Sequence, residues 1–441
     1  MTTPRSLATQ ILERIEKDGA YSHIALSAAL DQSDLEERDR ALVTELVYGT
    51  LTYQRTLDGI LSQFISRRLD KVDLPILISL RMATYQLVYL DRIPEHAAVN
   101  EAVNLVKQRG GRGAAGFANG VLRAMLRKKD KWNLLRNLDP QESPITYLGL
   151  STSLPDWIAR RMIESYGFDR ALSIAESFNR RPPLYFRALQ EPPSPLPAGL
   201  SPVDQVPGAF SSPGTNQEIQ QALAEKSLVI QDLGSQLIGH FAAPAADARI
   251  LDACAGLGGK SLLLASLTGP ESSLLATEPQ ASKLQLLQET ITDTPLNDRI
   301  STFQGTLKAL PADQPPFDLI LVDAPCTGLG VIRRHPETRW RRHPRDIASL
   351  SSIQRKLLAQ AARRIRPGGI LVYSVCTFTP EEGPDQITRF LEAHPDFIRQ
   401  APPQDSPLDW SRFLNDQGDL ELNPADHDTD GFYAARLIKK S

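Results

Sequence analysis

Hydrophobic residues in the first ~140 positions recur every three to four residues, which is the spacing of an amphipathic helix. Leu7, Ile11 and Ile15 illustrate this pattern, and the apolar run beginning at Leu74 carries a proline in its first turn, where helices tolerate it. This part contains no run with the two-residue period of a strand. We therefore predict an all-α bundle over residues 1–140.

The next part of the chain has a different pattern. A short helical segment follows Pro155, and an extended apolar run begins after Arg180. Seven prolines then interrupt residues 192–213, and proline cannot donate to the ladder of a central strand. We predict a small α+β connector or RNA-recognition module over residues 141–225.

From residue 226 onward, short apolar runs alternate with helical segments, which is typical of a mostly parallel sheet with helices on both faces. We therefore predict a Rossmann-like α/β domain over residues 226–441. Together with the two preceding regions, this gives a multi-domain chain. Its length of 441 residues is sufficient for separate cores.

Composition limits the possible environments. The three cysteines are widely spaced, which offers neither a metal-ligand pair nor a disulfide framework and favours a reducing compartment. No stretch of about 18 apolar residues predicts a membrane span, and the first residues do not resemble a secretion signal. We expect a cytoplasmic protein without a metal ion.

The net charge of −3 is unevenly distributed. Residues 401–430 contain eight acidic residues and one arginine, for a local charge of −7, so the rest of the chain sums to +4. The average charge therefore does not exclude a polyanionic partner such as a nucleic acid.

A glycine-rich turn follows the apolar run that ends at Asp252, in the sequence Asp252-Ala-Cys-Ala-Gly-Leu-Gly-Gly-Lys-Ser. A phosphate-binding Walker loop would need glycine at Cys254, and a dinucleotide fingerprint would need glycine at Ser261. A site for S-adenosylmethionine remains compatible, because Glu278 lies where an acid can bind ribose hydroxyls. A purely structural turn is the alternative.

Two cysteines lie in turns that directly follow apolar runs. Cys326 is part of Asp323-Ala-Pro-Cys-Thr-Gly, and Cys376 is part of Tyr373-Ser-Val-Cys-Thr. Because the carboxyl ends of parallel strands form one crevice, both thiols can reach one substrate. A thiolate is a good nucleophile near neutral pH, whereas a buried structural cysteine is the alternative.

These motifs together resemble those of the Sun family of RNA cytosine-C5 methyltransferases, which has Asp-x-Cys-Ala-Ala-Pro-Gly-Gly-Lys, Asp-Ala-Pro-Cys-Ser-Gly and Thr-Cys-Ser. The segment Leu87-Val-Tyr-Leu-Asp-Arg-Ile-Pro-Glu-His is similar to the RNA-binding NusB fold. The combination resembles the bacterial members that act on 16S ribosomal RNA. This resemblance implies S-adenosylmethionine as cofactor and RNA as partner.

The resemblance also implies residue roles. Cys376 would attack C6 of the cytosine, Asp323 would hydrogen-bond the base near N3, and Cys326 would assist loss of the C5 proton and release of Cys376. The cofactor residues implied are Cys254, Ala255, Gly256, Leu257, Gly258, Gly259, Lys260, Glu278, Thr306 and Asp323.

Three positions depart from the family pattern. Ala255-Gly-Leu replaces Ala-Ala-Pro in the glycine-rich turn, Thr306 stands where an aspartate is expected, and Gly383 replaces the final asparagine of Pro-Glu-Glu-Asn. The departures leave both cysteines and Asp323 in place, so we expect catalysis to be retained.

An arginine-rich segment follows the Cys326 motif, and arginine binds phosphates and stacks on bases, as tryptophan also does. The predicted RNA-binding residues are Arg333, Arg334, Arg339, Trp340, Arg341, Arg342 and Arg345. A solvated charged loop is the alternative interpretation. The target cytosine would have to be single-stranded or flipped out of its helix.

Alternative functions remain at this level. The chain can be a non-catalytic NusB-like RNA-binding or assembly factor, or it can perform the same chemistry on transfer RNA or at another ribosomal site. Target choice depends on RNA shape, which sequence motifs do not encode. We expect a monomer that binds RNA, most simply 16S ribosomal RNA, and no membrane.

Overall fold

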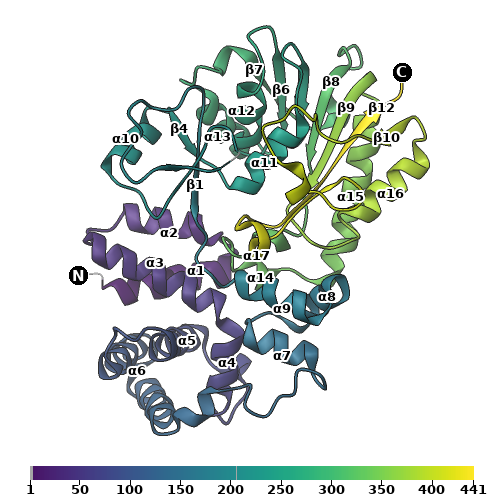
Figure 1. Cartoon of the computed structure of the whole chain (residues 1–441). Helices are drawn as coiled ribbons and strands as arrows, with labels where there is room; N and C mark the ends of the chain where they lie inside the picture. Colours follow the sequence, from purple (N-terminus) through teal and green to yellow (C-terminus); the bar gives the residue numbers. More distant parts are fainter. Residues whose placement is uncertain (1–2, 205) are drawn as a thin grey trace. The chain divides into compact units, whose positions relative to one another are not determined.

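The computed structural model describes residues 3–204 and 206–441. The chain divides into two compact units (Figure 1). The helical unit comprises Met1–Arg180 and Ile332–Arg342, and the sheet unit comprises Arg181–Val331 and His343–Ser441. A short segment of the C-terminal half therefore belongs to the helical unit.

The helical unit confirms the predicted all-α region. Among the described residues, its α-helices are α1 (Pro4–Asp18), α2 (Ser22–Asp31), α3 (Glu37–Thr52), α4 (Gln54–Ser62), α5 (Leu74–Tyr89), α6 (Glu95–Arg127), α7 (Pro144–Ser151), α8 (Asp156–Tyr166), α9 (Phe168–Ser177) and α14 (Thr338–Arg341). None of the described helices in the chain combines the length and apolar character needed to span a membrane.

Helix α5 lies between two apolar clusters of this unit. Ile78 and Met82 pack in the cluster formed with α1 and α3, whereas Leu77 and Leu80 pack in the cluster formed with α6. A helix buried on both sides needs apolar residues around most of its circumference, which explains the long hydrophobic run after Leu74.

Strands of the sheet unit form a mostly parallel sheet in the order β10-β12-β9-β8-β5-β6-β7, with β11 paired to β12. Strands β5 to β9 pair in parallel, and β12 runs antiparallel to β9. This confirms the predicted Rossmann-like sheet. The strands are β5 (Arg249–Asp252), β6 (Ser273–Glu278), β7 (Ile300–Gln304), β8 (Phe317–Asp323), β9 (Ile365–Val375), β10 (Phe397–Arg399), β11 (Leu420–Leu422) and β12 (Phe432–Lys439).

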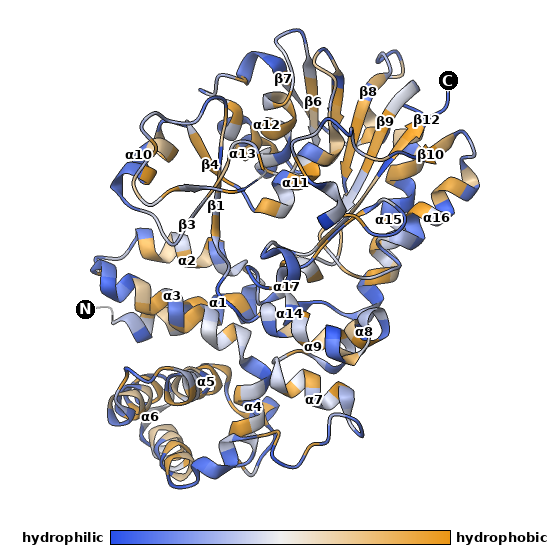
Figure 2. Cartoon of the chain, in the orientation of Figure 1, coloured by the Kyte–Doolittle hydropathy of each residue, from blue (hydrophilic) through white to orange (hydrophobic). Residues whose placement is uncertain are grey.

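Alternation along the strands builds one apolar layer on each face of this sheet. In β8, Leu319 and Leu321 belong to the cluster with α11 to α13, whereas Ile320 and Val322 belong to the cluster with α15 and α16. Figure 2 shows the resulting concentration of hydrophobic residues in the central strands. The helices are α11 (Leu233–Ala242), α12 (Gly259–Ser266), α13 (Ala281–Ile291), α15 (Pro344–Ala362), α16 (Pro384–Ala393) and α17 (Pro424–His427).

A second, smaller sheet belongs to the same unit. Its order is β2-β3-β1-β4, all antiparallel, and Phe186 and Phe210 pack beneath it with Ile219 of α10. The elements are β1 (Leu184–Ala188), β2 (Ser201–Pro202), β3 (Ala209–Ser212), β4 (Leu228–Ile230) and α10 (Gln217–Ala224).

The region predicted as a connector, residues 141–225, is divided between the two units near residue 180. Helices α7 to α9 belong with the helices, because α7 packs against α4 and α8 and α9 continue that layer. The small sheet belongs with the larger one. The proposed boundaries at 140 and 225 therefore do not coincide with the division of contacts.

Candidate active site

Three neighbouring strands end at one edge of the large sheet. The order β9-β8-β5 and the parallel pairing place Asp252, Asp323 and Ser374 together at this edge, with Asp323 directly opposite Ser374 in the register. The turns that carry Cys254, Cys326 and Cys376 follow immediately. The topology therefore brings the predicted glycine-rich and cysteine motifs to one site, as expected for a parallel sheet.

Cys326 and Cys376 lie in direct contact, with 3.2 Å between their sulfur atoms. Neither cysteine forms a disulfide, and the N–H of Gly330 donates to the carbonyl of Cys376 over 2.9 Å. The hydrogen bond to Cys376, together with burial, raises the pKa of the Cys326 thiol well above its ordinary value. Cys326 is therefore a poor source of a thiolate near neutral pH.

Asp323 is held from both sides. Lys260 Nζ donates to Oδ2 over 2.7 Å, and Ser374 Oγ donates to Oδ1 over 2.7 Å. Burial alone would lower the pKa of Lys260, but the Asp323 carboxylate overcomes this and leaves the pKa above its ordinary value. The Lys260 ammonium also lies 5.4 Å from the centre of the Phe432 ring. Lys260 is therefore a charged group within the site.

The glycine-rich turn is shaped by two left-handed residues, Gly256 (φ +56°) and Gly258 (φ +88°). A Cβ on Gly258 would approach the Leu287 side chain to 2.5 Å, so glycine is required there for space as well as conformation. Helix α12 begins directly afterwards at Gly259. Its first N–H groups lie beside the turn, which is the geometry that binds polar groups of a ligand.

Asp252 and Cys254 form the buried floor of this turn. Asp252 is 1% exposed and accepts a hydrogen bond from Ser261 Oγ over 2.7 Å, while burial raises its pKa to about 6. Burial also raises the pKa of the Cys254 thiol, and nearby carboxylates add to this effect. Cys254 is thus a protonated neighbour of the turn rather than a nucleophile.

The remaining predicted cofactor residues follow the next strands of the sheet. Glu278 ends β6, is 5% exposed, and accepts a hydrogen bond from the N–H of Gln280 over 2.9 Å. Thr306 follows the neighbouring β7 and is exposed, as is Leu257 in the glycine-rich turn. Because β5, β6 and β7 are adjacent, these residues lie along the same carboxyl edge.

The arginine-rich segment is placed differently from the sequence prediction. Arg339 is 1% exposed, and its guanidinium donates to the carbonyls of Thr52, Thr152 and Phe178 over 3.0, 3.3 and 3.1 Å. Its Nη1 and Nη2 atoms are therefore committed to the backbone of the helical unit. The structure assigns Arg339 a structural role in place of the predicted RNA contact.

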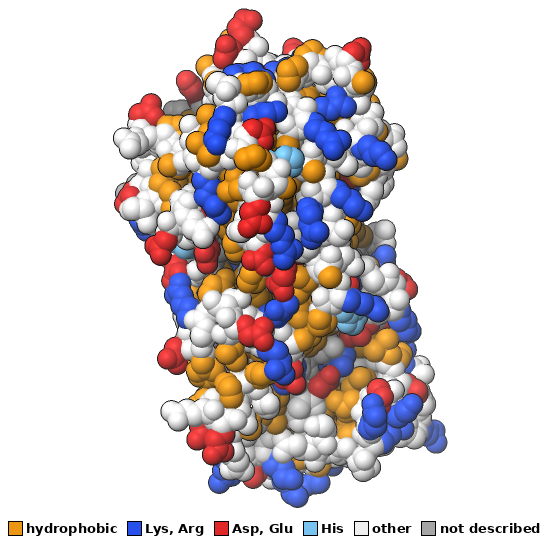
Figure 3. Space-filling view, turned by 90° about the vertical axis from the view of Figure 1, so that its right-hand side faces the viewer, with side chains coloured by type: hydrophobic (Ala, Val, Ile, Leu, Met, Phe, Trp, Pro, Cys, Tyr) orange, Lys and Arg blue, Asp and Glu red, His pale blue; other side chains and the backbone are white. Residues whose placement is uncertain are grey.

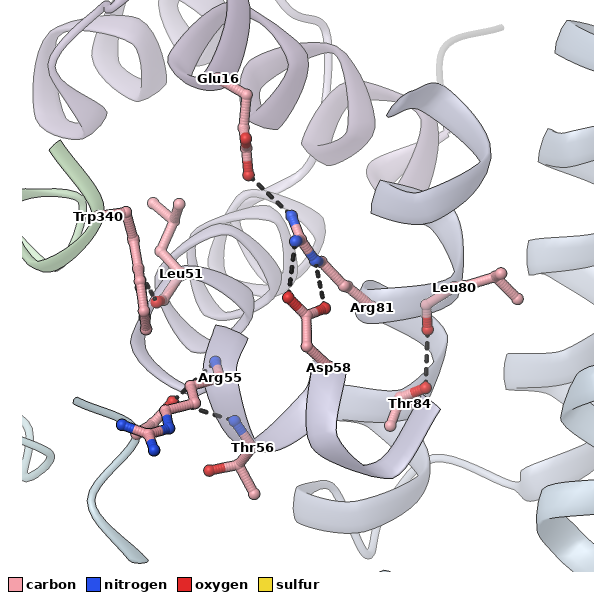
Figure 4. A network of polar contacts seen from close by, with 10 residues as sticks. Glu16, Leu51, Arg55, Thr56, Asp58, Leu80, Arg81, Thr84 and Trp340 are labelled. Carbon is pink, nitrogen blue, oxygen red and sulfur yellow. Dashed lines mark hydrogen bonds and ion pairs between the residues drawn. The ribbon is translucent and has the colours of Figure 1, made fainter. Parts of the chain in front are cut away.

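Other members of this segment also bind the helical unit. Trp340 Nε1 donates to the carbonyl of Leu51 over 2.8 Å, as Figure 4 shows, and Arg341 donates to the carbonyl of Ile15 over 2.9 Å. Arg333 is 8% exposed and donates to the carbonyl of Arg180 over 3.2 Å. Four members of the predicted RNA-binding set therefore anchor the segment to the helices: Arg333, Arg339, Trp340 and Arg341.

Arg345 differs from these residues because it is exposed at the start of α15, within the sheet unit. Arg334 and Arg342 are half-buried. On the face drawn in Figure 3, basic side chains alternate with acidic ones instead of forming one continuous field. Of the predicted RNA-binding set, Arg345 is thus the exposed candidate.

Several residues of the site were not predicted from the sequence. Ser374 binds Asp323, Phe432 contacts Lys260, and the buried carboxylate of Glu382 accepts hydrogen bonds from the turn after Cys326. Ser374 lies in the Cys376 motif and Glu382 in the segment that corresponds to Pro-Glu-Glu-Asn, so their motifs could have identified them. Phe432 lies on the distant strand β12, and no motif indicates it. Within the described part of the chain, no group of His, Cys, Asp and Glu side chains is arranged to hold a metal ion.

Comparisons with known proteins match both halves of the chain. Residues 240–438 match the family model "16S rRNA methyltransferase RsmB/F", and residues 2–127 match the NusB family. The "Probable ribosomal RNA small subunit methyltransferase B" of Bacillus subtilis is 33% identical, with coverage of 100% of this chain and 99% of that protein.

Solved structures share the fold. PH0851 has a TM-score of 0.81 at 22% identity, covering 100% of this chain and 99% of that one. NSun6 from Pyrococcus horikoshii, solved with SFG, has a TM-score of 0.55 at 18% identity, covering 64% of this chain and 97% of that one. The resemblance inferred from the motifs is confirmed by these matches, and the chain belongs to the RsmB/F family of 16S rRNA methyltransferases.

Proposed function

We propose that this protein transfers a methyl group from S-adenosylmethionine to C5 of a cytosine in 16S ribosomal RNA, through a covalent adduct with Cys376. The observation that carries the proposal is the pair of thiols 3.2 Å apart beside Asp323. We assign the nucleophile to Cys376 because the raised pKa of the Cys326 thiol makes Cys326 the poorer source of a thiolate.

The first step makes C5 reactive. Cys376 Sγ forms a bond to C6 as its S–H proton passes to N3, toward which the electrons of the C5–C6 double bond move. Asp323 is positioned to hydrogen-bond this edge of the base, and the charged Lys260 beside it stabilises the developing negative charge. Preorganised charges in a site that excludes water are worth more than the same charges in solution.

The residues of the glycine-rich turn fit S-adenosylmethionine. Space is open beside Gly256, where a Cβ would meet no atom within 4 Å, and Glu278 offers a carboxylate for ribose hydroxyls. When bound, this cofactor supplies an activated methyl group on a sulfonium. SFG, with which the NSun6 structure was solved, is an analogue of S-adenosylmethionine, which supports the same site here.

Release completes the cycle. Once Cys376 Sγ is bonded to C6, Cys326 loses the hydrogen bond that contributes most to its raised pKa. Cys326 can then give its proton to solvent and act as the base of the release step. It accepts the C5 proton, the C5–C6 double bond re-forms, and the bond between C6 and Cys376 Sγ breaks. The departing Cys376 thiolate takes back the proton held at N3, so both thiols are restored and the proton that Cys326 gave to solvent is the one released overall.

Substitution of the two cysteines should cause different defects. Cys376→Ala should abolish both methyl transfer and the adduct, whereas Cys326→Ala should form the adduct and fail to release it. Denaturing gels with labelled 16S transcript resolve the adduct as a shifted band, and the double variant serves as control. An adduct in Cys376→Ala would contradict the assignment.

The cofactor site has its own test. Glu278→Ala should weaken S-adenosylmethionine binding by about 1.5–3 kcal/mol for each charge-assisted hydrogen bond lost. Calorimetry without RNA measures this, and Glu271→Ala, at an exposed position outside the turn, is the matched control. Equal affinities of the two variants for S-adenosylmethionine would show that Glu278 does not bind the cofactor.

The substrate is tested separately. Ribosomal RNA and transfer RNA from a strain that lacks the gene are incubated with the protein, and 5-methylcytosine is mapped in both. We expect a new modification in 16S ribosomal RNA. Modification of transfer RNA alone would support the proposed methylation of cytosine but refute 16S ribosomal RNA as the substrate.

A further inference from the structure

A buried carboxylate lies behind the Cys326 turn. Glu382, between β9 and α16, is 0% exposed. Its Oε1 accepts from Thr327 N over 2.8 Å and from Gln354 Nε2 over 3.1 Å, and its Oε2 accepts from Thr327 Oγ1 and Thr379 Oγ1 over 2.5 and 2.7 Å. All four donors are neutral groups.

These contacts tie the two cysteine turns together. Thr327 directly follows Cys326, and its hydroxyl also contacts the hydroxyl of Thr377, which directly follows Cys376, over 2.9 Å. Gln354 of α15 donates in addition to the carbonyl of Pro325 over 2.9 Å. The backbone on both sides of Cys326 is therefore linked to one carboxylate, and through Thr327 to the Cys376 turn.

A carboxylate in this environment is costly to bury. Transfer of a charge out of water is strongly unfavourable, and here it is compensated by several hydrogen bonds instead of a salt bridge. The main chain of the Glu382 segment is fixed as well, because Tyr373 Oη donates to the carbonyl of Glu382 over 2.5 Å. Such a charge is poorly explained by stability alone.

We propose that Glu382 is a positioning residue whose buried carboxylate fixes the Cys326 turn against Cys376 for the release step. The proposal rests on the proposed function for the meaning of that step. Glu382 acts through Thr327 and Gln354 rather than by contact with substrate. A defect in positioning of this kind reduces rates by about tenfold to a hundredfold.

Glu382→Gln is the informative variant, because it preserves shape but places an amide N–H₂ against groups that are themselves donors. It should lower turnover about tenfold to a hundredfold, accumulate the protein–RNA adduct as Cys326→Ala does, and bind S-adenosylmethionine within about twofold of wild type. Glu392→Gln, at an exposed position of α16, is the control and should match wild type.

A second variant distinguishes a loss of positioning from misfolding of Glu382→Gln. Thr327→Val removes the hydroxyl that links Glu382 to Thr377 while its N–H remains, and should show the same adduct accumulation to a smaller degree. Turnover of Glu382→Gln equal to that of Glu392→Gln, or reduced turnover without adduct where Cys326→Ala does accumulate adduct, would overturn the positioning role and leave the proposed function intact.

Alkylation of the thiols provides a measurement that needs neither RNA nor methyl transfer. Iodoacetamide reaction of full-length protein, followed by peptide mass spectrometry across pH, should show Cys326 reacting several-fold faster and at lower pH in Glu382→Gln than in Glu392→Gln. This pattern supports the positioning role even if no adduct forms in any variant. Identical Cys326 profiles in the two variants would refute it.

Discussion

Lys260 and Arg339 are both buried cations, but their surroundings differ. At the edge of the large sheet, Lys260 contacts a carboxylate and an aromatic ring and lies near the Cys376 thiol. Arg339, in the helical unit, donates only to backbone carbonyls among its recorded hydrogen-bond partners. Lys260 is thus paired with the carboxylate of the proposed reaction site, whereas Arg339 donates to backbone carbonyls at the ends of helices.

The pKa values of the two groups reflect this difference. Burial lowers the pKa of Arg339 to about 10, whereas Asp323 keeps the pKa of Lys260 above its ordinary value despite burial. Carbonyl dipoles satisfy donors but do not neutralise charge, while a carboxylate does both. A positively charged sequence motif therefore has no functional meaning until its partners are known.

Removal of Lys260 should have the largest effect on activity. Lys260→Met should slow single-turnover methyl transfer about 10²- to 10³-fold, because Asp323 loses its counter-charge and the base edge loses a stabilising cation. Quench-flow with labelled cofactor measures the rate, and Lys283→Met, at an exposed position of α13, is the reference. A loss below about tenfold would place Lys260 among structural cations like Arg339.

Removal of Arg339 should mainly affect stability. Arg339→Met leaves three carbonyls of the helical unit without their donor, and the free energy of unfolding should fall by about 3–5 kcal/mol. Urea unfolding followed by circular dichroism measures the change, with Arg345→Met, at an exposed site, expected to stay within about 0.5 kcal/mol. Loss of RNA affinity at unchanged stability would instead restore the RNA-contact role.

Asp252 provides an anionic counterpart to these cations. Its pKa is raised to about 6 by burial, so the folded chain binds this proton more tightly than the unfolded chain. Its contribution to stability is therefore greatest below the unfolded pKa near 4 and is lost as pH rises to about 6. As pH rises from about 4 to about 6, the free energy of unfolding of Asp252→Asn should therefore increase by about 2–3 kcal/mol relative to that of wild type.

Unfolding free energies measured across this pH range, with Asp313→Asn at an exposed site as reference, test the Asp252 prediction. If the free energies of unfolding of Asp252→Asn and wild type differ by the same amount at every pH, the cost of burying the Asp252 charge is compensated, as it is at Lys260.

Arg345 should show the smallest effect. If it contacts a phosphate, Arg345→Gln should reduce the salt dependence of RNA binding by about 0.7–0.9 units of slope without altering cofactor affinity. Titrations at several salt concentrations measure the slope, and Arg355→Gln, exposed on the same helix, is the matched variant. The same slope change in both variants would indicate general charge attraction and no particular contact.

The fold and the convergence of the cysteine and glycine-rich motifs at one sheet edge were predictable because they depend on local signals. Helical periodicity identified the bundle, alternating runs identified the parallel sheet, and glycine and cysteine turns after strands converge by topology in any such sheet. Cys326, Cys376, Asp323 and the glycine-rich turn were therefore placed together before any coordinate was known.

The roles of Arg339, Trp340 and Glu382 were not predictable in this way. Each depends on partners remote in sequence: Arg339 on Thr52, and Glu382 on Thr327 and Gln354. Charged and polar side chains appear the same in a sequence whether they face solvent, a substrate or a carbonyl. Burial and partner identity, which set their energies, exist only in the folded chain.

By itself, the amino-acid sequence determined the elements and their order, the carboxyl edge as the site, and the residues able to do chemistry there. Only the tertiary structure decided that the two thiols touch, which cation is paired with a carboxylate, and which arginines belong to the core. The physical reason is that hydrophobic periodicity is local, whereas hydrogen-bond partners and dielectric surroundings are set by contacts between distant segments.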